Sequence, residues 1–518
     1  MKKYKRLAIA ATMTVGLLLS ACGNDKNATD SEKSSSDKQL TIAHFYEMKE
    51  LDPVIAWDGW NLSRMGIGEN LIQLDENMNI KPVIAQEWEE QDTRTTIFTI
   101  RDDVTFHNGK AVDAEAVKAS LERAIATTDR EDIKIPVATI EAQGNKLTIT
   151  TTEPFPTLLN NLADPVYIIV DATAAEQDEA KFKLHPIATG PFKIERFAPP
   201  MEMNLVKHTE HWSGAVAVDK VTVKGIADDA TRVMALQSGE VDFITQVGAK
   251  DVQLFEGNEA YNVLRGPNLR VFQLGINMRQ PYMNNLAFRQ AMAHALNKEM
   301  YAENLVKGTP AVGPFTKELS FGYQGEDKYQ YDVDKANALL DKAGFKDSDG
   351  NGIRELDGED IILKYVLTTD HGNDAKNVAV AIQDDFKKVG IGVDVVLVEN
   401  YNDMVNNGDY DLVWERWTSA PTADPAYFIE ANYVTDALGN KGKYTNAEID
   451  KIVEAFHNEF DKEKRDALGR EATEILLEDI PTLFMYYQEG TVITKANVTG
   501  IARFMSEIYY IDERVKVD

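Results

Sequence analysis

The chain has 518 residues, and its 84 acidic and 55 basic side chains give a formal net charge of −29 at pH 7. A field this negative repels polyanions, so it excludes attraction of nucleic acid or anionic lipid through overall charge. With 43% hydrophobic residues the chain is globular. It is too long for a single hydrophobic core, so we expect two or three lobes.

Residues 1–21 have the layout of a secretory signal peptide, in which a basic start precedes an apolar run too short to span a bilayer. The run leads into Leu19-Ser20-Ala21-Cys22, which resembles the bacterial lipobox and contains the single cysteine of the chain. That resemblance implies cleavage before Cys22 and attachment of a diacylglycerol to its sulfur. The alternative is an ordinary signal peptide beside a lone thiol. Residues 22–38 are polar and predict a flexible tether.

The first part of the folded chain predicts short strands and few helices. Residues 40–44 alternate as a strand, and the aromatic pair Trp57 and Trp60 leads into a short helical run that contains Arg64. Residues 96–106 read as extended, and residues 146–155 as a further strand. Between them, Asp113 is placed to cap a helix that ends near Ile125. This pattern favours a small α+β lobe.

From about residue 355 the pattern alternates strictly between strand and helix. Residues 361–369, 393–399 and 410–417 read as strands, and the first two are separated by a helical repeat of apolar residues at 378, 382 and 386. Such alternation implies right-handed crossovers and a parallel sheet. Because ligands bind beyond the carboxyl ends of the strands in such sheets, we predict a cleft at residues 368–374, 399–403 and 418–428.

The order of motifs along the chain resembles the peptide/nickel class, or family 5, of ABC-importer extracytoplasmic solute-binding lipoproteins. The resemblance extends over nearly all of the chain after the tether. The motifs are LDP (51–53), ENLIQLDENMNIKPVIAQEW (69–88), FTIRDDVTFHNGKAVDAEAVKASLERA (98–124), ATGPFKI (188–194), ALQSGEVDF (235–243), FRQAMAHALNKE (288–299) and GDYDLVWERWTSAPTADPAYF (408–428).

This resemblance implies an α/β protein with a two-lobed, periplasmic-binding-protein type II-like fold of cluster C and an additional small α+β domain. Lobe Ia is expected over residues 39–74, 181–264 and 491–518. Lobe Ib is expected over 75–180, and lobe II over 265–490. A ligand would lie between lobes that close by a hinge motion.

The resemblance also implies a function. A monomeric receptor, anchored by the lipid on Cys22 at the extracytoplasmic face of the bacterial membrane, captures a solute and delivers it to an ABC permease and its ATPase. It implies no enzymatic activity, no nucleic-acid partner and no intrinsic cofactor. A rival from another class is an extracytoplasmic hydrolase on the same scaffold, although the sequence has neither a G-x-S-x-G elbow nor an H-E-x-x-H motif.

Within the class, residues 411–428 are similar to the nickel and metal-chelate receptors. That similarity implies a transition metal such as nickel, cobalt or zinc, bound as a chelate or metallophore whose carboxylates meet arginine forks. The candidate residues are the arginines Arg416, Arg64 and Arg130, the tryptophans Trp57, Trp60 and Trp417, and Tyr46, His44, Thr418, Tyr433 and Tyr487.

Two departures from the nickel pattern keep a second ligand class open. A histidine often follows the Asp-Pro turn in nickel receptors, whereas this chain has Glu430, Asn432 and Tyr433 after Asp424-Pro425. An arginine expected in lobe Ib is replaced by the sequence ADPVY at 163–167. A chelator that fills the coordination sphere of the metal needs no protein histidine. A dipeptide or oligopeptide ligand needs no metal.

The histidines divide into two groups. His44, at the end of the first strand, and His371, at the carboxyl end of a later strand, are placed to face the cleft and are the candidate metal ligands. We expect His107, His294 and the pair His208 and His211 to be structural. Residues 347–358 resemble a calcium-binding loop, but Gly358 stands where a bidentate glutamate belongs, so we interpret them as a turn.

Overall fold

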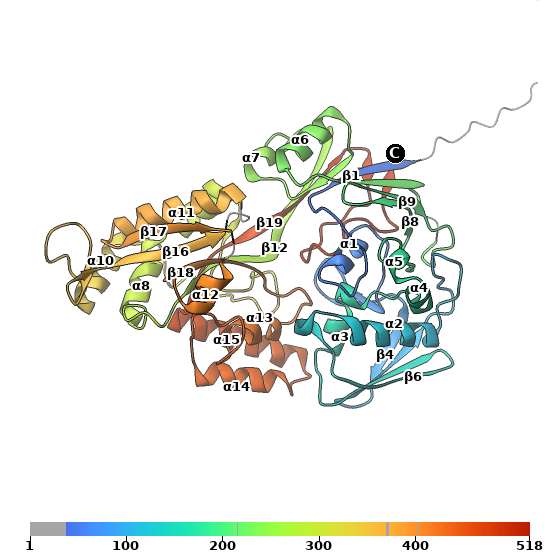
Figure 1. Ribbon diagram of the computed structural model, residues 1–518, viewed down its shortest axis with the longest axis horizontal. Coiled ribbons are helices and arrows are strands. Elements are labelled where there is room, and N and C mark those ends of the chain that lie inside the picture. The colour runs from blue at the N-terminus through green and yellow to red at the C-terminus, as the bar shows by residue number, and fades with distance from the viewer. Residues whose placement is uncertain (1–37, 215, 369–371, 400) are drawn as a thin grey trace, which may run out of the picture. The chain divides into compact units, whose positions relative to one another are not determined.

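The computed structural model describes residues 38–518, except residues 215, 369–371 and 400 and the side chains of 249, 372 and 373 (Figure 1). Cys22, the predicted signal peptide and residues 22–37 of the predicted tether lie outside the described residues, and so does His371. In the described part of the chain, no helix combines the length and the apolarity that are needed to span a bilayer.

An eleven-stranded sheet runs through the described residues (Figure 1). Its hydrogen-bonded order is β17-β16-β18-β12-β19-β11-β1-β10-β9-β8, and β13 pairs with β19 beside this path. The strands are β1 (Gln39–His44), β8 (Phe192–Ala198), β9 (Glu202–Lys207), β10 (Lys220–Gly225), β11 (Phe243–Thr245), β12 (Tyr261–Ile276), β13 (Thr309–Pro310), β16 (Ile362–Thr368), β17 (Gly392–Val398), β18 (Leu412–Thr418) and β19 (Thr482–Lys495).

The two long strands β12 and β19 connect the two halves of this sheet. They are antiparallel: residues 261–267 of β12 pair with 489–495 of β19, and residues 271–275 pair with 482–487. The register shifts between Pro267 and Val271, next to Arg270 and Gln488. Each half of the sheet therefore continues into the other through these two strands alone.

The predicted parallel arrangement after residue 355 is confirmed. β16 pairs in parallel with both β17 and β18. The crossover from β16 to β17 is helix α11 (Gly372–Lys387), and α12 (Asn402–Asn407) joins β17 to β18. The apolar repeat of α11, with Val378, Ile382 and Phe386, is fully buried against the sheet. These elements also bring residues 401–402 and 418–428 to one edge of the sheet.

The predicted small α+β region is an antiparallel sheet of order β4-β5-β7-β6 with helix α2 packed on it. Its elements are β4 (Ala85–Glu90), β5 (Thr95–Ile100), α2 (Ala114–Thr127), β6 (Val137–Gln143) and β7 (Lys146–Thr151). Asp113 caps α2 by accepting the Ala116 amide, as predicted. The extended prediction over 96–106 is wrong beyond Ile100, because the chain turns back on itself there and only Thr105 forms a bridge, to Ala111.

The remaining elements are short connections and helices that cover the sheets. They are α1 (Asp58–Arg64), β2 (Ile72–Leu74), β3 (Ile80–Pro82), η1 (Glu131–Ile133), α3 (Leu158–Leu162), η2 (Pro165–Tyr167), α4 (Ala172–Gln177), α5 (Glu179–Phe182), α6 (Asp229–Ser238), α7 (Ala249–Val252), α8 (Leu286–Ala295), α9 (Lys298–Met300), η3 (Tyr301–Val306), α10 (Val333–Ala343), β14 (Glu355–Leu356), β15 (Glu359–Asp360), α13 (Ala426–Tyr433), α14 (Ala447–Phe456), α15 (Lys462–Asp479), β20 (Val498–Thr499) and β21 (Lys516–Val517).

Candidate functional site

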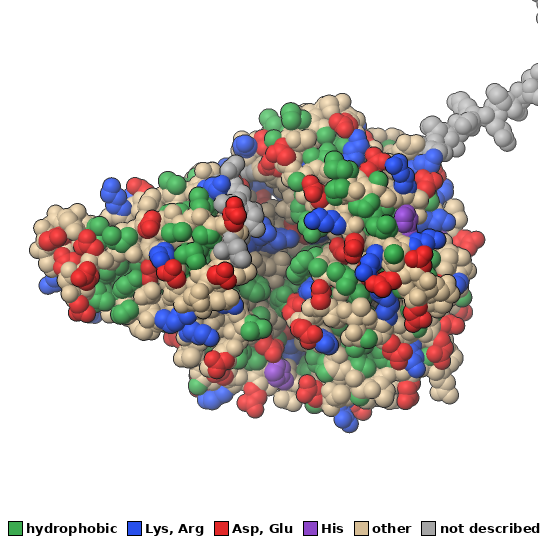
Figure 2. Space-filling view, viewed as in Figure 1, with side chains coloured by type: hydrophobic (Ala, Val, Ile, Leu, Met, Phe, Trp, Pro, Cys, Tyr) green, Lys and Arg blue, Asp and Glu red, His purple; other side chains and the backbone are tan. Residues whose placement is uncertain are grey.

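A cavity of about 570 Å³ lies between the segment around α1 and the segments that follow β17 and β18. Figure 2 shows a hollow in the molecule with basic side chains inside it. The lining residues are Phe45, Tyr46, Trp57, Trp60, Asn61, Arg64, Gln246, Arg270, Tyr401, Asn402, Glu415, Arg416, Trp417, Thr418, Pro421, Tyr427, Gly439, Lys441 and Gln488. Its volume is typical of a site for a small molecule, about 300–1,000 Å³.

Many of the predicted binding residues lie together on this cavity. They are Tyr46, Trp57, Trp60, Arg64, Arg416, Trp417 and Thr418. Helix α1 positions Trp60 and Arg64. The end of β18 positions Arg416, Trp417 and Thr418. The two segments are more than 350 positions apart in sequence and meet because the sheet folds between them.

Arg130 supports the cavity wall from behind and does not line the cavity. Its guanidinium carbon lies 3.9 Å from the centroid of the Trp57 ring, and its Nε donates to Asp132 Oδ1 at 2.7 Å. A stacked and ion-paired guanidinium of this kind fixes the tryptophan. Arg130 is therefore not among the described lining residues, and its role as a fork for the ligand stays a prediction.

His44 is fully buried and lies behind the cavity wall. Its Nε2 is 3.2 Å from Asn61 Oδ1, and burial, with help from the Arg64 charge, lowers its pKa to about 3. The imidazole is therefore neutral at physiological pH, and it contacts α1 rather than the cavity. The other candidate metal ligand, His371, lies outside the described residues.

Tyr433 and Tyr487 do not line this cavity, although Tyr433 lines a small chamber beside it. The Tyr433 hydroxyl donates to Thr482 Oγ1 at 3.2 Å. The Tyr487 hydroxyl is 2.8 Å from the Phe315 carbonyl oxygen and 2.7 Å from that of Gly313. Both side chains are buried in the core between α13, α15 and β19, and their hydroxyls form hydrogen bonds within the fold.

Glu507, which the sequence did not single out, holds two arginines of the cavity in place. Its main-chain oxygen accepts from Arg64 Nε at 3.0 Å, and its Oε2 accepts from Arg270 Nε at 2.8 Å. Its Oε1 accepts from the side-chain amides of Gln246, at 2.6 Å, and Asn268, at 3.0 Å. Burial alone raises the pKa of Glu507, but the charges of Arg270 and Arg64 and the hydrogen bonds from Arg270 and Asn268 together outweigh it and hold that pKa below its usual range.

The charges that line the cavity are unequal. Among the described lining residues, Arg64, Arg270, Arg416 and Lys441 accompany one acidic side chain, Glu415, and Glu507 behind the wall is already paired with Arg270. Burial raises the pKa of the Glu415 carboxyl to about 7, because the Gln273 amide and the Lys441 charge offset that burial only in part. Neither histidine nor cysteine is among the described lining residues. The arrangement therefore fits a solute with more carboxylate than ammonium groups.

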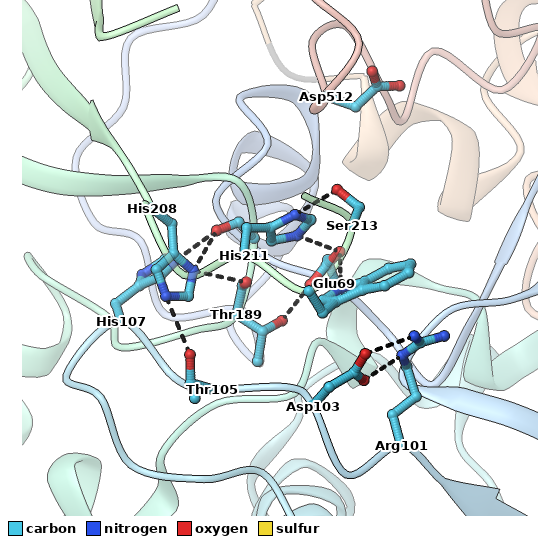
Figure 3. A network of polar contacts seen from close by, with 12 residues as sticks. Glu69, Arg101, Asp103, Thr105, His107, Thr189, His208, His211, Ser213 and Asp512 are labelled. Atoms are coloured by element: carbon cyan, nitrogen blue, oxygen red, sulfur yellow. Dashed lines mark hydrogen bonds and ion pairs between the residues drawn. The ribbon is translucent and has the colours of Figure 1, made fainter. Parts of the chain in front are cut away.

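Three of the expected structural histidines, His107, His208 and His211, form part of a buried polar network away from the cavity (Figure 3), and His294 contacts the Gln330 carbonyl elsewhere. His211 Nε2 lies 3.1 Å from Glu69 Oε1, and His208 Nε2 lies 3.3 Å from Thr105 Oγ1. Thr189 donates to the second oxygen of Glu69 at 2.8 Å. Neighbouring His107 contacts the Gly190 carbonyl. These contacts join β9 and its following turn to the loop before α2, which agrees with a structural role.

Asp347, Asp349 and Glu355 form the one His, Cys, Asp or Glu group among the described residues whose ligand atoms are close enough to hold a metal ion. All three side chains are at least partly exposed. Asp349 Oδ1 accepts the amide of Asn351, as in an ordinary Asx turn, and Asp347 Oδ1 accepts the amides of Gly350 and Asn351. The turn interpretation of this loop is in keeping with these bonds.

The sequence pattern missed part of the lining but carried a signal for some of it. Tyr401, Asn402, Pro421 and Tyr427 lie in the segments predicted to leave the carboxyl ends of parallel strands. Arg270, Gln246 and Gln488 come from the connecting strands or their borders. No local motif marks these three residues, because only the pairing of β11, β12 and β19 brings them to the cavity.

Comparison with known proteins identifies similar chains. This chain is 26% identical over 521 residues to the nickel-binding protein NikA of Staphylococcus aureus, with 100% of both covered. It is 25% identical over 527 residues to the oligopeptide-binding protein AppA of Bacillus subtilis, with 96% of both covered.

Solved structures share the fold. The crystal structure of a nickel ABC transporter protein from Bacillus halodurans superimposes with a TM-score of 0.80 at 29% identity, covering 93% of this chain and 100% of that one. NikA of S. aureus in complex with Ni(L-His)2 superimposes with a TM-score of 0.76 at 24% identity, with the same coverage.

The family described as bacterial extracellular solute-binding proteins, family 5 (middle), matches residues 79–439, which is more than half of the chain. Its members are substrate-binding proteins with the mixed α/β fold seen here. The chain belongs to the family 5 extracellular solute-binding proteins of ABC importers.

Proposed function

We propose that this protein is the lipid-anchored receptor of an ABC importer and that it captures a transition-metal chelate of the nickel type in the 570 Å³ cavity. The observation that carries the proposal is the set of four basic side chains on a cavity whose described lining has neither histidine nor cysteine. Among the described lining residues a bare metal ion finds no soft or imidazole ligand. A metal held by a polycarboxylate chelator presents oxygens that arginines bind as forks.

Each part of the cavity has a role in this proposal. Arg64, Arg270 and Arg416 bind the carboxylates of the chelator, and Trp57, Trp60 and Trp417 enclose its apolar parts. In this proposal the two lobes close around the chelate, with β12 and β19 as the hinge. Support comes from relatives whose names and structures describe binding of nickel or of Ni(L-His)2.

The test is calorimetric titration of the purified protein with Ni(II) plus L-histidine, with Ni(II) alone as a comparison. We expect binding of the complex and not of the bare ion. Because a charged hydrogen bond contributes about 1.5–3 kcal/mol, Arg416→Ala is expected to weaken binding roughly ten- to a hundredfold. Arg94→Ala, which alters an exposed arginine of the small α+β region, is the matched control. Equal binding of bare Ni(II) contradicts the proposal.

The second candidate is a receptor for a dipeptide or oligopeptide, which the partly buried carboxylate of Glu415 favours because peptides carry a terminal ammonium group. Native mass spectrometry of protein purified from a rich-medium host separates the two candidates. A bound mass that contains metal supports the chelate, and a metal-free series of peptide masses supports the alternative.

Anchoring and delivery are tested in cells. We propose that Cys22 carries the lipid at the extracytoplasmic face of the membrane and that a permease and an ATPase accept the solute there. A Cys22→Ser variant is then expected in the medium or the soluble extracytoplasmic fraction. If the variant stays in the membrane fraction to the same extent as the wild type, this assignment is contradicted.

A further inference from the structure

Glu415 occupies an unusual position for a carboxylate. It lies on β18 beside Gln273 of β12, and Gln273 Nε2 donates to its Oε2 at 2.8 Å. No ion pair joins it to a basic side chain among the described residues. The nearest basic neighbour on the cavity, Lys441, donates instead to Asn406 Oδ1 at 2.9 Å. A partly buried carboxylate without a cationic partner is unfavourable unless a partner arrives.

Two further buried polar atoms next to Glu415 lack a hydrogen-bond partner. They are Oε1 of Gln273 and the hydroxyl of Tyr410, and the two side chains are 1% and 2% exposed. Both residues line a small side chamber of about 20 Å³, which shares Glu415, Gly439 and Lys441 with the main cavity. A chamber of this size admits one group about as large as a water molecule.

The backbone of β12 makes room for this carboxylate. A Cβ atom at Gly275 would lie 3.1 Å from Glu415 Oε2 and 2.9 Å from Val413 Cγ1. Glu415 therefore lies directly over a glycine of the neighbouring strand. Its position at the mouth of the chamber is set by the sheet and not by a loop.

We propose that Glu415 binds a primary ammonium group of the transported solute, so that the solute is zwitterionic, with this ammonium at β18 and its carboxylates at the arginines. An ammonium group donates three hydrogen bonds. Among the residues that line the chamber, the Glu415 carboxylate and the unpartnered Gln273 Oε1 are acceptors for such a group. This inference rests on the proposed function, since it describes the solute bound in the same cavity.

The zwitterion requirement applies to either candidate solute. A short peptide supplies the ammonium at its N-terminus. A metal chelate satisfies it only if one amine of the chelator stays free of the metal. The raised pKa of Glu415 agrees with a site that is completed by a cation, because a bound ammonium group favours the ionised carboxylate.

The test uses two matched pairs of probes that differ only in one amine. The first pair is the nickel complex of Nα,Nα-bis(carboxymethyl)-L-lysine, which has a free side-chain amine, and the same complex with that amine acetylated. The second pair is the dipeptide Ala-Ala and N-acetyl-Ala-Ala. We expect the wild type to bind the amine form of at least one pair ten- to a hundredfold more tightly.

Glu415→Gln keeps an acceptor for Gln273 but removes the charge, and it is expected to abolish this preference without weakening the acetylated form. Gly275→Ala, which displaces the carboxylate and leaves its charge, is expected to reduce the preference as well. Thermal unfolding of both variants checks that they are folded.

A preference that survives in Glu415→Gln overturns the inference. So does a wild type that binds the acetylated form as well as the free amine, and this result leaves the proposed receptor function intact. A wild type that binds neither pair, and from which no amine-bearing solute is released on denaturation, contradicts both proposals.

Discussion

At the scale of single residues, Glu507 shows how the fold prepares cationic side chains for a ligand. Its backbone is in the left-handed region, at φ +58°, which side-chain-bearing residues rarely adopt and which costs on the order of 1 kcal/mol or more. That conformation points the main-chain oxygen at Arg64 while the carboxylate binds Arg270. The two bonds to Arg64 and Arg270 therefore offset the cost of this backbone conformation, and they fix both arginines before the solute binds.

Glu507→Ala tests this role. We expect a loss of about 3–5 kcal/mol in the free energy of unfolding, because Arg270 stays buried without its partner. Ligand affinity is expected to fall in addition, since Arg64 and Arg270 are no longer oriented. Denaturant unfolding and calorimetric titration measure the two effects.

The matched control is Glu489→Ala, which breaks the partly exposed ion pair with Arg265 on the same two strands, β12 and β19. An ion pair of that exposure contributes about 0–1 kcal/mol. Similar losses in the two variants would show that Glu507 acts only as an ordinary surface partner.

His107 makes stability depend on pH. Burial lowers its pKa to about 3, whereas the imidazole of the unfolded chain titrates near 6.5. The folded state therefore resists protonation: its stability is complete above pH 6.5 and is lost as the pH falls towards 3. For this residue alone the loss at pH 5 is about 2 kcal/mol relative to pH 7.5.

His107→Gln keeps a donor for the Gly190 carbonyl and cannot be protonated. Urea unfolding at pH 7.5 and pH 5 is expected to show a smaller acid-induced loss in this variant than in the wild type. His457→Gln, at a side chain that is 56% exposed, is expected to leave the pH dependence unchanged. The same acid sensitivity in wild type and His107→Gln would contradict the assignment.

At the scale of elements, the parts of the site that could be predicted are those carried by local patterns. The alternation after residue 355 predicts β16, β17 and β18 and so places Arg416, Trp417 and Thr418 at a strand end. The aromatic pair before α1 predicts the opposite wall. Arg130 contacts Asp132 and Trp57 instead of lining the cavity, and a sequence motif does not show which charges are already paired.

The remaining elements of the site depend on contacts over long sequence distances. Gln246, Arg270 and Glu507 come from three separate segments and meet through the pairing of β11, β12 and β19. Glu415 lies within the motif at 408–428, but its importance follows from the burial of Gln273 and from Gly275 beneath it. These relations exist only once the sheet has formed.

Helix α1 gives an element-scale prediction through Gly59. A Cβ atom there would lie 2.5 Å from the Pro165 carbonyl oxygen, so Gly59→Ala forces α1 away from η2. We expect a destabilisation of about 1–3 kcal/mol and weaker ligand binding, because α1 carries Trp60 and Arg64. Chemical denaturation and calorimetry measure both.

The neighbouring Asp58 provides a control in which the expected change in stability has the opposite sign. Burial, together with Glu50, Asp52 and Asp129, raises the pKa of Asp58 to about 7. Its charge is thus unfavourable in the fold, and Asp58→Asn is expected to stabilise the protein above pH 7. A Gly59→Ala variant with unchanged stability and affinity would show that α1 tolerates displacement.

At the scale of the whole folded unit, residues 38–518, one sheet is continuous through both walls of the cavity. β12 and β19 pass from one half of the sheet to the other, and their register shifts beside Arg270 and Gln488, on the cavity itself. A rotation about these two strands changes the separation of α1 from the end of β18 without disturbing the pairing within either half. Arg270 and Gln488 therefore belong both to the cavity and to the proposed hinge.

Hydrogen–deuterium exchange tests closure about these strands. With a saturating ligand we expect slower amide exchange in residues 45–64 and in residues 401–441 together, because closure buries both walls. Arg416→Ala at the same ligand concentration is the control, and both segments are expected to stay near their unliganded rates. Protection confined to one segment would mean that the ligand binds one wall without closure. In that case β12 and β19 act as a rigid support, and the solute is released to a partner from an open site.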